Sequence, residues 1–466
     1  MVNPPMRRRS HLKWLIPGMH VKRWLLLLML GTTIASVGIA FILRDALISL
    51  SSFPAAYFAT MQFLDRPLRV VLLLALGITL IGVALYKLSQ ALVEPFLRPG
   101  QGNVVDVVYE HRRRRGGPKV VAIGGGTGLS TLLRGLKTYT DNITAIVTVA
   151  DDGGSSGRLR QELGLPPPGD FRACMAALSD AEGLMTRLFE YRFGEGMGLH
   201  GHSFGNLFIA TMTNITGSFE NGLAESSRVL AVRGQVVPST LQDVTLCADL
   251  RDNHDAAGWQ RVRGESAIPK SGKRIERVFL QPDNAPAYPV AVKAILDADL
   301  IVAGPGSLYT SVLPNLLVDG IARAVKAARA PRVYVCNVAT QPGETTGFSV
   351  ADHVQALNQH VGRGTFTHVL ANYNVDVAVP DEAANFAWVV PPAQEIPGIA
   401  VHLADLVDRQ RPWRHDSSLV AAALMQLYEQ LFSPLTDPAE PNLNHTISVD
   451  ELVQLREPNR RFHNGV

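Results

Sequence analysis

Cysteine is scarce in this sequence, which holds only Cys174, Cys247 and Cys336 among its 466 residues. The three lie far apart and have no closely spaced histidine or cysteine, which excludes a disulfide framework and the common zinc motifs. Each falls among apolar residues. We therefore expect three small core side chains in a protein of a reducing compartment.

An excess of charge of one sign is also nearly absent, because 44 Lys and Arg against 41 Asp and Glu leave a formal net charge of only +3. The basic residues near the N-terminus flank apolar segments, so no nucleic-acid partner is predicted. A P-loop lysine, a serine–histidine–acid series and a metal-ligand cluster are missing as well. The sequence therefore identifies no bond-breaking step, although its 47% of hydrophobic residues allows a sizeable core.

Two long apolar runs lie near the N-terminus, at residues 24–43 and 70–88, and each is long enough to cross about 30 Å of hydrocarbon as a helix. Lys and Arg gather before the first run and after the second, whereas the segment between them has only Arg44, Arg66 and Arg69. Because positive residues stay on the cytoplasmic side, we predict a two-helix transmembrane hairpin in the cell membrane with both termini cytoplasmic. Alternatively, the first run is a cleaved signal, and the second still leaves the large domain inside.

These features predict the domain organisation. A basic cytoplasmic tail at 1–23 precedes the transmembrane helices at 24–43 and 70–88, which an outer loop at 44–69 separates. A linker rich in arginine and glycine follows at 89–117, then a nucleotide-binding α/β domain at 118–431 and a C-terminal tail at 432–466 that begins with a proline-rich segment.

The segment from Val120 to Arg160 has the pattern of a phosphate-binding unit. The apolar run Val120–Ile123 predicts a buried strand, and an amphipathic helix begins near Leu129. The glycine-rich turn between them lets the backbone approach a ligand, and the helix N-terminus favours an anion. The candidate ligand-binding residues of this turn are Gly124, Gly125, Gly126, Thr127 and Gly128.

Asp151 and Asp152 follow a second apolar strand, so we expect them at the carboxyl end of a central parallel strand, where ligands of such sheets sit. Their carboxylates can accept from sugar hydroxyls or hold Mg²⁺ beside phosphates. With Arg158 they are also the candidate catalytic residues if a phosphoryl group is transferred. The alternative is that both are solvated carboxylates of a turn.

A second turn of the same kind follows the apolar strand that ends near Ala303. Gly304, Gly306 and Ser307 predict close backbone approach and hydrogen bonds to phosphate or sugar hydroxyls, and Asn337 follows a further strand. Strands that each end in a polar loop predict an α/β fold with a Rossmann-like, doubly wound, mainly parallel sheet. Residues 223–283 predict a strand-rich insertion that covers this sheet.

Several motifs resemble those of the CofD-like family, which contains bacterial gluconeogenesis factors and 2-phospho-L-lactate transferases. They are IGGGTG at 123–128, ADDGGSSGRLR at 150–160, PPPGDFR at 166–172, GHSFGN at 201–206, GPGSLYTSVLPNLL at 304–317 and CNVATQPGET at 336–345. The resemblance implies ligand contacts by Asp170, Arg172, His202 and Asn206. Ala173 departs from the family pattern, which has asparagine there. Asp170 alternatively caps the helix that follows it.

The TQPGET and GPGSLYTS forms resemble the gluconeogenesis-factor branch, whose members bind UDP-sugars and support cell shape and wall synthesis on gluconeogenic carbon sources. The resemblance therefore implies a membrane-anchored, non-catalytic regulator that binds a nucleotide diphosphate-sugar, self-associates and cooperates with cell-wall synthesis enzymes. The alternative is a 2-phospho-L-lactate transferase that acts on a deazaflavin with a guanosine diphosphate donor. A nicotinamide dehydrogenase is disfavoured, since Leu129 stands at the third glycine position of the dinucleotide fingerprint.

Overall fold

A computed structural model of the chain describes residues 113–180, 183–194, 198–251, 258–377, 386–432 and 447–448, together with scattered positions between 30 and 86. The chain divides into two units, Met1–Arg113 and Arg114–Val466. In the first unit the described positions between 67 and 86 are helical. Among all described residues, no helix has the length and apolarity that crossing a bilayer requires. The predicted spans lie largely outside the described residues and stay predictions.

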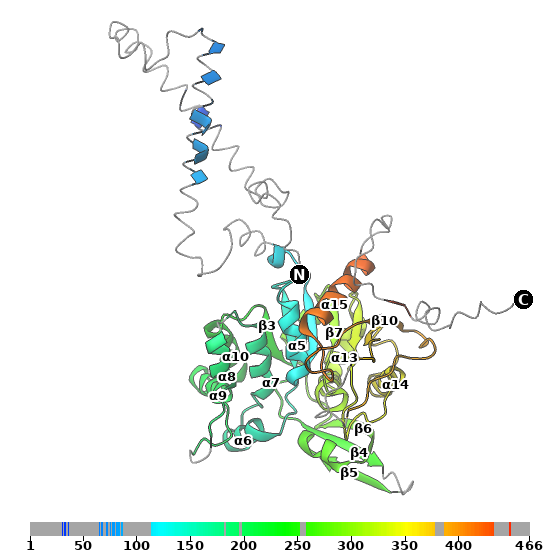
Figure 1. Cartoon of the computed structure of the whole chain (residues 1–466). Helices are drawn as coiled ribbons and strands as arrows, with labels where there is room; N and C mark the ends of the chain where they lie inside the picture. The colour runs from blue at the N-terminus through cyan, green and yellow to red at the C-terminus, as the bar shows by residue number, and fades with distance from the viewer. Residues whose placement is uncertain are drawn as a thin grey trace, which may run out of the picture. The chain divides into compact units, whose positions relative to one another are not determined.

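The second unit is built on an eight-stranded sheet with the order β11-β10-β9-β8-β7-β1-β2-β3 (Figure 1). Every pairing is parallel except that of β10 with β11. The central strands are apolar runs buried along their whole length, as expected when helices cover both faces. The strands are β1 (Val120–Gly124), β2 (Ile143–Val147), β3 (Gln235–Pro238), β7 (Leu300–Ala303), β8 (Arg332–Val335), β9 (His368–Asn372), β10 (Ala400–Ala404) and β11 (Ile447–Ser448).

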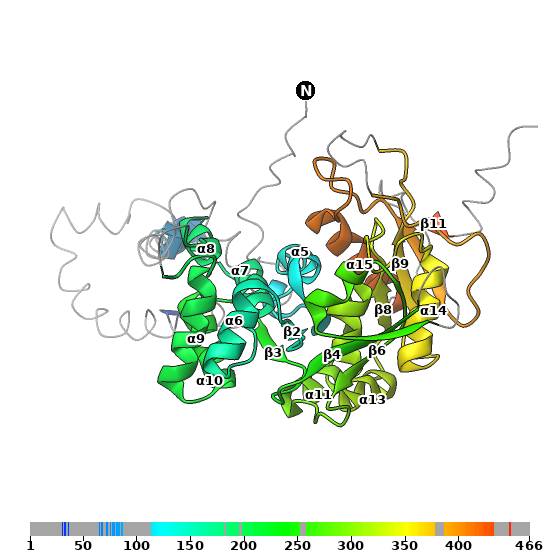
Figure 2. The ribbon, with the colours of Figure 1, turned by 90° about the horizontal axis from the view of Figure 1, so that it is seen from below.

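Helices cover both faces of this sheet (Figure 2). α5 packs against α7 and α15 on one face, and α11 packs against α13 on the other. The helices are α5 (Gly126–Leu136), α6 (Gly154–Leu163), α7 (Gly169–Leu178), α8 (Gly183–Glu190), α9 (Phe204–Thr216), α10 (Phe219–Val229), α11 (Pro289–Leu296), α12 (Leu313–Leu316), α13 (Asp319–Ala327), α14 (Val350–Val361) and α15 (Ser417–Phe432). This arrangement confirms the predicted Rossmann-like α/β fold.

The strand order reverses between β1 and β7. From β1 the chain adds β2 and β3 on one side, then returns to place β7 on the other side and continues outward to β10. The loops after β1 and β7 therefore diverge from the same point of the sheet, which is where ligands bind in folds of this type.

The predicted insertion at 223–283 is too long. Its first residues belong to α10, and the run Gln235–Pro238, which is buried after its exposed first residue, pairs with β2 as part of the main sheet. The insertion proper is a three-stranded antiparallel sheet with the order β5-β4-β6, formed by β4 (Thr245–Arg251), β5 (Trp259–Arg263) and β6 (Arg274–Gln281).

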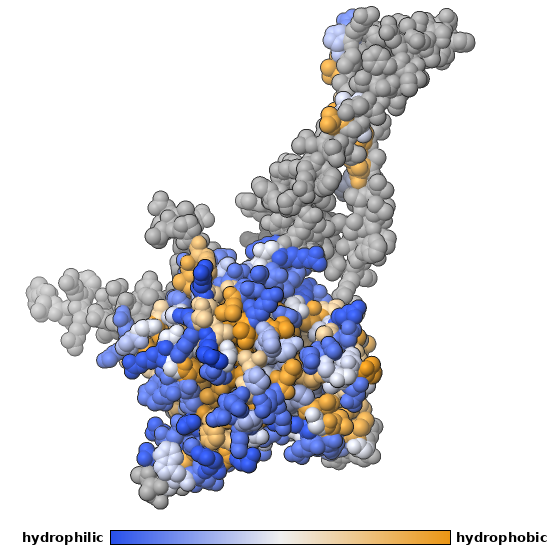
Figure 3. Space-filling model, turned by 180° about the vertical axis from the view of Figure 1, so that it is seen from behind, coloured by the Kyte–Doolittle hydropathy of each residue, from blue (hydrophilic) through white to orange (hydrophobic). Residues whose placement is uncertain are grey.

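The core of the second unit is continuous and apolar, and its surface mixes hydrophilic residues with scattered hydrophobic ones (Figure 3). Cys174, Cys247 and Cys336 are unpaired and buried. Cys174 and Cys336 belong to the core, as expected, whereas Cys247 lies outside the core cluster, on the other face of β4.

Candidate functional site

A cavity of about 480 Å³ lies at the strand-order reversal, above the carboxyl ends of the central strands. The turns after β1, β2, β7 and β8 contribute to its wall, together with the start of α7, the insertion and a segment before α15. Nine predicted site residues line it: Gly125, Gly126, Thr127, Gly128, Asp151, Asp170, Gly306, Ser307 and Asn337.

The first glycine turn presents the N-terminus of α5 to the cavity. Gly125 precedes the helix in an extended conformation, and the first intrahelical amide bond runs from Leu129 N to Gly125 O at 3.4 Å. The amides of the preceding helical residues have no partner within the helix. Thr127 and Gly128 therefore offer their N–H groups to an anion at the positive end of the helix dipole.

Close packing fixes the shape of this turn. A Cβ atom on Gly125 would lie 2.3 Å from Asp170 Oδ2, and one on Gly128 would lie 2.4 Å from the carbonyl oxygen of Pro305. Both distances are below van der Waals contact, so a side chain at either position would push the two turns or the Asp170 carboxyl away.

The second glycine turn, which follows β7, leads into a helical segment whose first residues already bond to a carboxylate of the protein itself, that of Glu344. Glu344 Oε1 accepts from Thr310 Oγ1 at 3.0 Å. Burial raises the pKa of Glu344, and hydrogen bonds from Thr310 and from the backbone amides of Tyr309 and Thr310 oppose that rise. These amides begin the π-helical turn η5 (Leu308–Val312), so a phosphate would have to displace a carboxylate there.

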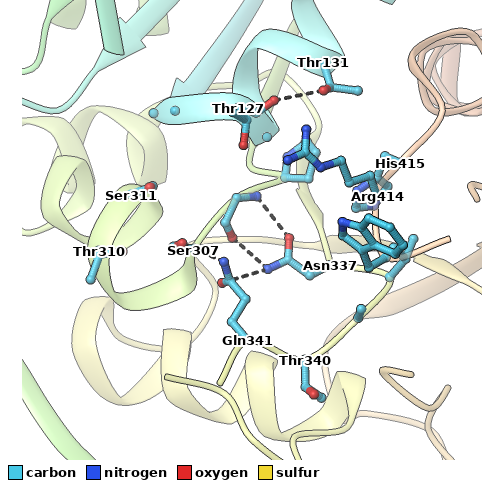
Figure 4. A pocket seen from close by; sticks show the side chains of 18 of the residues that line it. Thr127, Thr131, Ser307, Thr310, Ser311, Asn337, Thr340, Gln341, Arg414 and His415 are labelled. Carbon is cyan, nitrogen blue, oxygen red and sulfur yellow. Dashed lines mark hydrogen bonds between the residues drawn. The ribbon is translucent and has the colours of Figure 1, made fainter. Parts of the chain in front are cut away.

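Side-chain amides hold the second turn to the loop after β8 (Figure 4). Asn337 accepts from Gly306 N at 3.0 Å and donates to Gly306 O at 2.9 Å, while Gln341 Nε2 donates to Ser307 Oγ at 2.8 Å. Asn337 therefore holds the backbone of Gly306 in place in the cavity wall. Gly304 itself does not line the cavity, and its N–H bonds to Ile123 O at 2.9 Å within the sheet.

Sequence reasoning missed the contribution of the segment before α15. Trp413, Arg414 and His415 line the cavity, and the last two are labelled in Figure 4. Phe386 lies beside Trp413 at a ring-centroid distance of 6.2 Å. His415 Nε2 lies 3.1 Å from the carbonyl oxygen of Cys336, and burial lowers the pKa of His415 to about 4, so its ring is neutral. Among the cavity-lining residues that the structure describes, Arg414 is the one arginine.

Carboxyl groups dominate the electrostatics of the cavity. Burial, followed by repulsion from Asp151, raises the pKa of Asp170 to about 7, and a Gly126 amide bond opposes the rise. Burial and the nearby Asp151 and Asp152 raise the pKa of Glu265 to about 8. Burial also raises the pKa of Asp151. Near pH 7 a ligand phosphate therefore meets an Asp170 and a Glu265 that are substantially protonated.

Asp170 is not the predicted cap of its helix. α7 begins at Gly169 after Pro168, and no side chain caps it. The Asp170 carboxyl instead faces the Gly125–Gly126 turn. Glu265, which the sequence marked only as part of the insertion, reaches the same cavity from the turn after β5.

Three candidate residues near the first aspartate do not line the cavity. Asp152 Oδ1 accepts from Ser266 N at 2.9 Å and anchors the insertion, and Arg158 Nη2 donates to His200 O at 2.8 Å. Gly124 ends β1, where its carbonyl oxygen accepts from Asn315 Nδ2 at 2.9 Å. Of the three candidate catalytic residues, Asp151, Asp152 and Arg158, only Asp151 lines the cavity.

Arg172, His202 and Asn206 also lie outside the cavity lining. His202 Nδ1 is 3.0 Å from Ser155 Oγ, and Asn206 Nδ2 donates to the same oxygen at 3.0 Å. The side chains of Ser155, His202 and Asn206 are buried, and their hydrogen bonds join α6 to the start of α9. Arg172 packs beside Gly205, where a Cβ atom would lie 2.8 Å from Arg172 Cδ.

The acidic residues fit a divalent cation only when a ligand shares it. No group of three or more His, Cys, Asp or Glu side chains placed to hold a metal ion occurs in the described part of the chain. Asp151 and Asp170, rather than the predicted pair Asp151 and Asp152, face the cavity and repel each other. Mg²⁺ commonly binds one or two carboxylates together with substrate phosphates, and these two would hold it here.

The fold and the cavity together define a Rossmann-like α/β protein whose candidate site lies at the reversal of strand order. A family model described as 2-phospho-L-lactate transferase CofD matches residues 120–407. The chain therefore belongs to the CofD-like gluconeogenesis factor family, in agreement with the motif resemblance.

Individual relatives agree with this family. The chain is 55% identical to the gluconeogenesis factor of Bacillus subtilis, over 57% of this chain and 81% of that protein. A relative from Deinococcus radiodurans is 41% identical over 91% of each chain. The crystal structure of a Bacillus halodurans protein matches with a TM-score of 0.62 at 47% identity, covering 66% of this chain and 99% of that one.

Proposed function

We propose that this protein is a membrane-anchored regulator that binds a nucleotide diphosphate-sugar of the UDP-sugar type and supports cell shape and wall synthesis during gluconeogenic growth. One observation carries the ligand proposal. The cavity at the strand-order reversal combines the open N-terminus of α5 with a wall of amide and hydroxyl side chains. Such a site suits a diphosphate linked to groups rich in hydroxyls and carbonyls.

The contacts suggest how this ligand lies. The diphosphate binds at Thr127 and Gly128, because Glu344 fills the start of the second turn. The nucleoside and sugar then extend toward Asn337, Gln341 and Arg414. Mg²⁺ held by Asp151 and Asp170 would neutralise the phosphates beside these carboxyl groups.

Isothermal titration calorimetry of the full chain with UDP-N-acetylglucosamine, with GDP and with a deazaflavin tests this proposal. We expect the UDP-sugar to bind, with Mg²⁺ raising its affinity at alkaline pH. The variant Asn337→Ala should weaken binding because it frees the Gly306 backbone. An absence of heat with the UDP-sugar, in both the presence and absence of Mg²⁺, would refute the ligand assignment.

The alternative function is a 2-phospho-L-lactate transferase, which the description of the matching family model favours. Asp170 and Glu265 provide the specific structural support, because carboxyl groups with pKa values of about 7 and about 8 can donate and accept protons near neutral pH. Formation of a lactyl-phosphate product on the deazaflavin, followed by mass spectrometry, would establish this function over the regulatory one.

The membrane and assembly parts of the proposal rest on the sequence. Both termini lie in the cytoplasm, and the protein self-associates and contacts cell-wall synthesis enzymes. The buried native cysteines allow a direct test of topology. A membrane-impermeant maleimide should label Ser49→Cys in intact cells but not Ser10→Cys. Light scattering of the purified chain should give a mass above that of one copy.

A further inference from the structure

The insertion brings five arginines onto one face of a small sheet. In the antiparallel register, Cys247 of β4 lies between Arg263 and Phe279, Asp249 lies between Arg261 and Arg277, and Arg251 lies between Trp259 and Arg274. Side chains opposite one another in an antiparallel sheet point to the same face. We call these nine residues the arginine face.

The other face of this sheet is buried, so the arginine face is the outer one. Leu246, Ala248 and Leu250 of β4 belong to the core, as do Ile275 and Val278 of β6. The guanidinium-bearing side chains are accessible instead, with 63% of the Arg261 side chain and 70% of the Arg274 side chain exposed. The described surface where the insertion lies is predominantly hydrophilic, at the lower left of Figure 3.

The arginine face concentrates positive charge. Five arginines against the carboxylates of Asp249 and of Glu276, which pairs with Arg274 Nε at 3.3 Å, give this region a formal charge of +3, as much as the whole chain carries. Asp249 is bound by Arg261, with Nε to Oδ1 at 2.7 Å and Nη2 to Oδ2 at 3.1 Å. The loop that joins β4 to β5 at 252–257 lies outside the described residues.

Aromatic rings are interleaved with these guanidinium groups. The Arg261 and Arg277 guanidinium carbons lie 4.8 and 5.5 Å from the centroid of the Phe279 ring, and that of Arg251 lies 5.5 Å from Trp259. Such packing orders the planar groups while leaving N–H donors for phosphate oxygens. Trp259 is 59% exposed and offers a ring on which a base can stack.

We propose that the arginine face binds single-stranded nucleic acid. Phosphates would pair with the arginines of neighbouring strands, while bases stack on Trp259 and on exposed guanidinium planes. Proteins that bind single strands without sequence preference combine these two elements, a basic surface that follows the backbone and aromatic rings that stack on bases. Net charge does not reveal this surface, because acidic residues elsewhere in the chain offset these arginines.

The exposed tryptophan favours this partner over an acidic protein segment. An acidic protein segment would need the guanidinium charges but not the exposed tryptophan.

Fluorescence anisotropy of the full chain with labelled oligo-uridylate and oligo-deoxythymidylate tests the proposal. We expect binding that weakens as salt rises, with a log–log slope of about −0.7 for each phosphate contact. The double variant Arg263→Glu/Arg277→Glu should lower the affinity at least about tenfold and flatten this slope. Trp259→Ala should lower it at least about fivefold, and Trp259→Phe should retain it.

The matched control is Arg228→Glu/Arg323→Glu, which makes the same change of charge on exposed arginines of α10 and α13. It should leave oligonucleotide affinity within about twofold of the wild type. Circular dichroism and thermal unfolding confirm that each variant is folded. The proposal is overturned if neither oligonucleotide binds, if the control pair weakens binding as much, or if only anionic vesicles or polyglutamate bind this face.

Discussion

The two glycine-rich turns look alike in sequence but differ in what satisfies their amides. After β1, the Asp170 carboxyl bonds to the Gly126 amide, while Thr127 and Gly128 line the cavity with amides that have no partner within the helix. After β7, Glu344 reaches the helix start and bonds to Thr310, so the protein supplies its own anion. A helix N-terminus therefore offers a phosphate only those amides that internal carboxylates leave unpaired.

The largest expected effect comes from Gly128→Ala. Its Cβ atom would lie 2.4 Å from Pro305 O, so the two turns must separate. We expect UDP-sugar affinity to fall about tenfold to 100-fold by calorimetry, because overpacking of this kind costs about 1 to 3 kcal/mol. Gly183→Ala, which places its Cβ in open space, is the control and should bind normally. Equal binding by both variants would contradict a ligand at the first turn.

Asp170→Asn tests the carboxyl beside the first turn. The pKa of Asp170 in the folded state, about 7, exceeds the ordinary aspartate pKa of 3.8, so the folded state holds more protons between these pH values. Stability due to this group therefore falls as pH rises through that window, and the loss is complete above it. The asparagine variant should be more stable than wild type by about 2 to 4 kcal/mol at pH 8 and equal near pH 4 in urea unfolding.

The variant Glu344→Ala tests most directly which of the two turns binds the phosphates. Loss of the carboxylate leaves Thr310 and nearby amides without their acceptor, so the free energy of unfolding should fall by about 1 to 3 kcal/mol. UDP-sugar affinity at a temperature well below unfolding should change less than about threefold, since the diphosphate binds elsewhere. A loss as large as that of Gly128→Ala would mean that the second turn holds the phosphates after all.

Proton and metal dependence sharpen the comparison further. Without divalent cations, UDP-sugar affinity should fall about tenfold as pH rises from about 6 to about 9, because Asp170 and Glu265 acquire charge with pKa values of about 7 and about 8. Mg²⁺ should reduce this dependence by neutralising the carboxylates. A pH-independent affinity in EDTA would show that neither carboxyl faces the phosphates.

The smallest effect is expected for residues that the motifs suggested but the fold placed elsewhere. Arg158→Ala removes a bond to the His200 carbonyl oxygen outside the cavity. Its UDP-sugar affinity should stay within about twofold of wild type by calorimetry, because an exposed hydrogen bond contributes little. A larger loss of UDP-sugar affinity would mean that the ligand contacts α6 rather than lying within the cavity.

Local pattern was enough to determine the α/β fold class, the strand and helix on either side of the first glycine turn, and the buried cysteines. Apolar runs such as Val120–Ile123 and the glycines after them specify their structure through near neighbours, and the family motifs lie in these same segments. Local pattern could not predict which strands pair when they are distant in the sequence. The run Gln235–Pro238 could belong to the insertion or to the main sheet until its partner, β2, was known.

The site's composition was decided only by tertiary structure. Glu344 meets Thr310, and Arg414 and His415 meet the first glycine turn in one cavity, although long stretches of chain separate them. The five arginines of the arginine face come together through the register of three strands. Sequence specifies which groups a segment carries, whereas packing decides which groups meet, because contacts between distant residues depend on the whole fold.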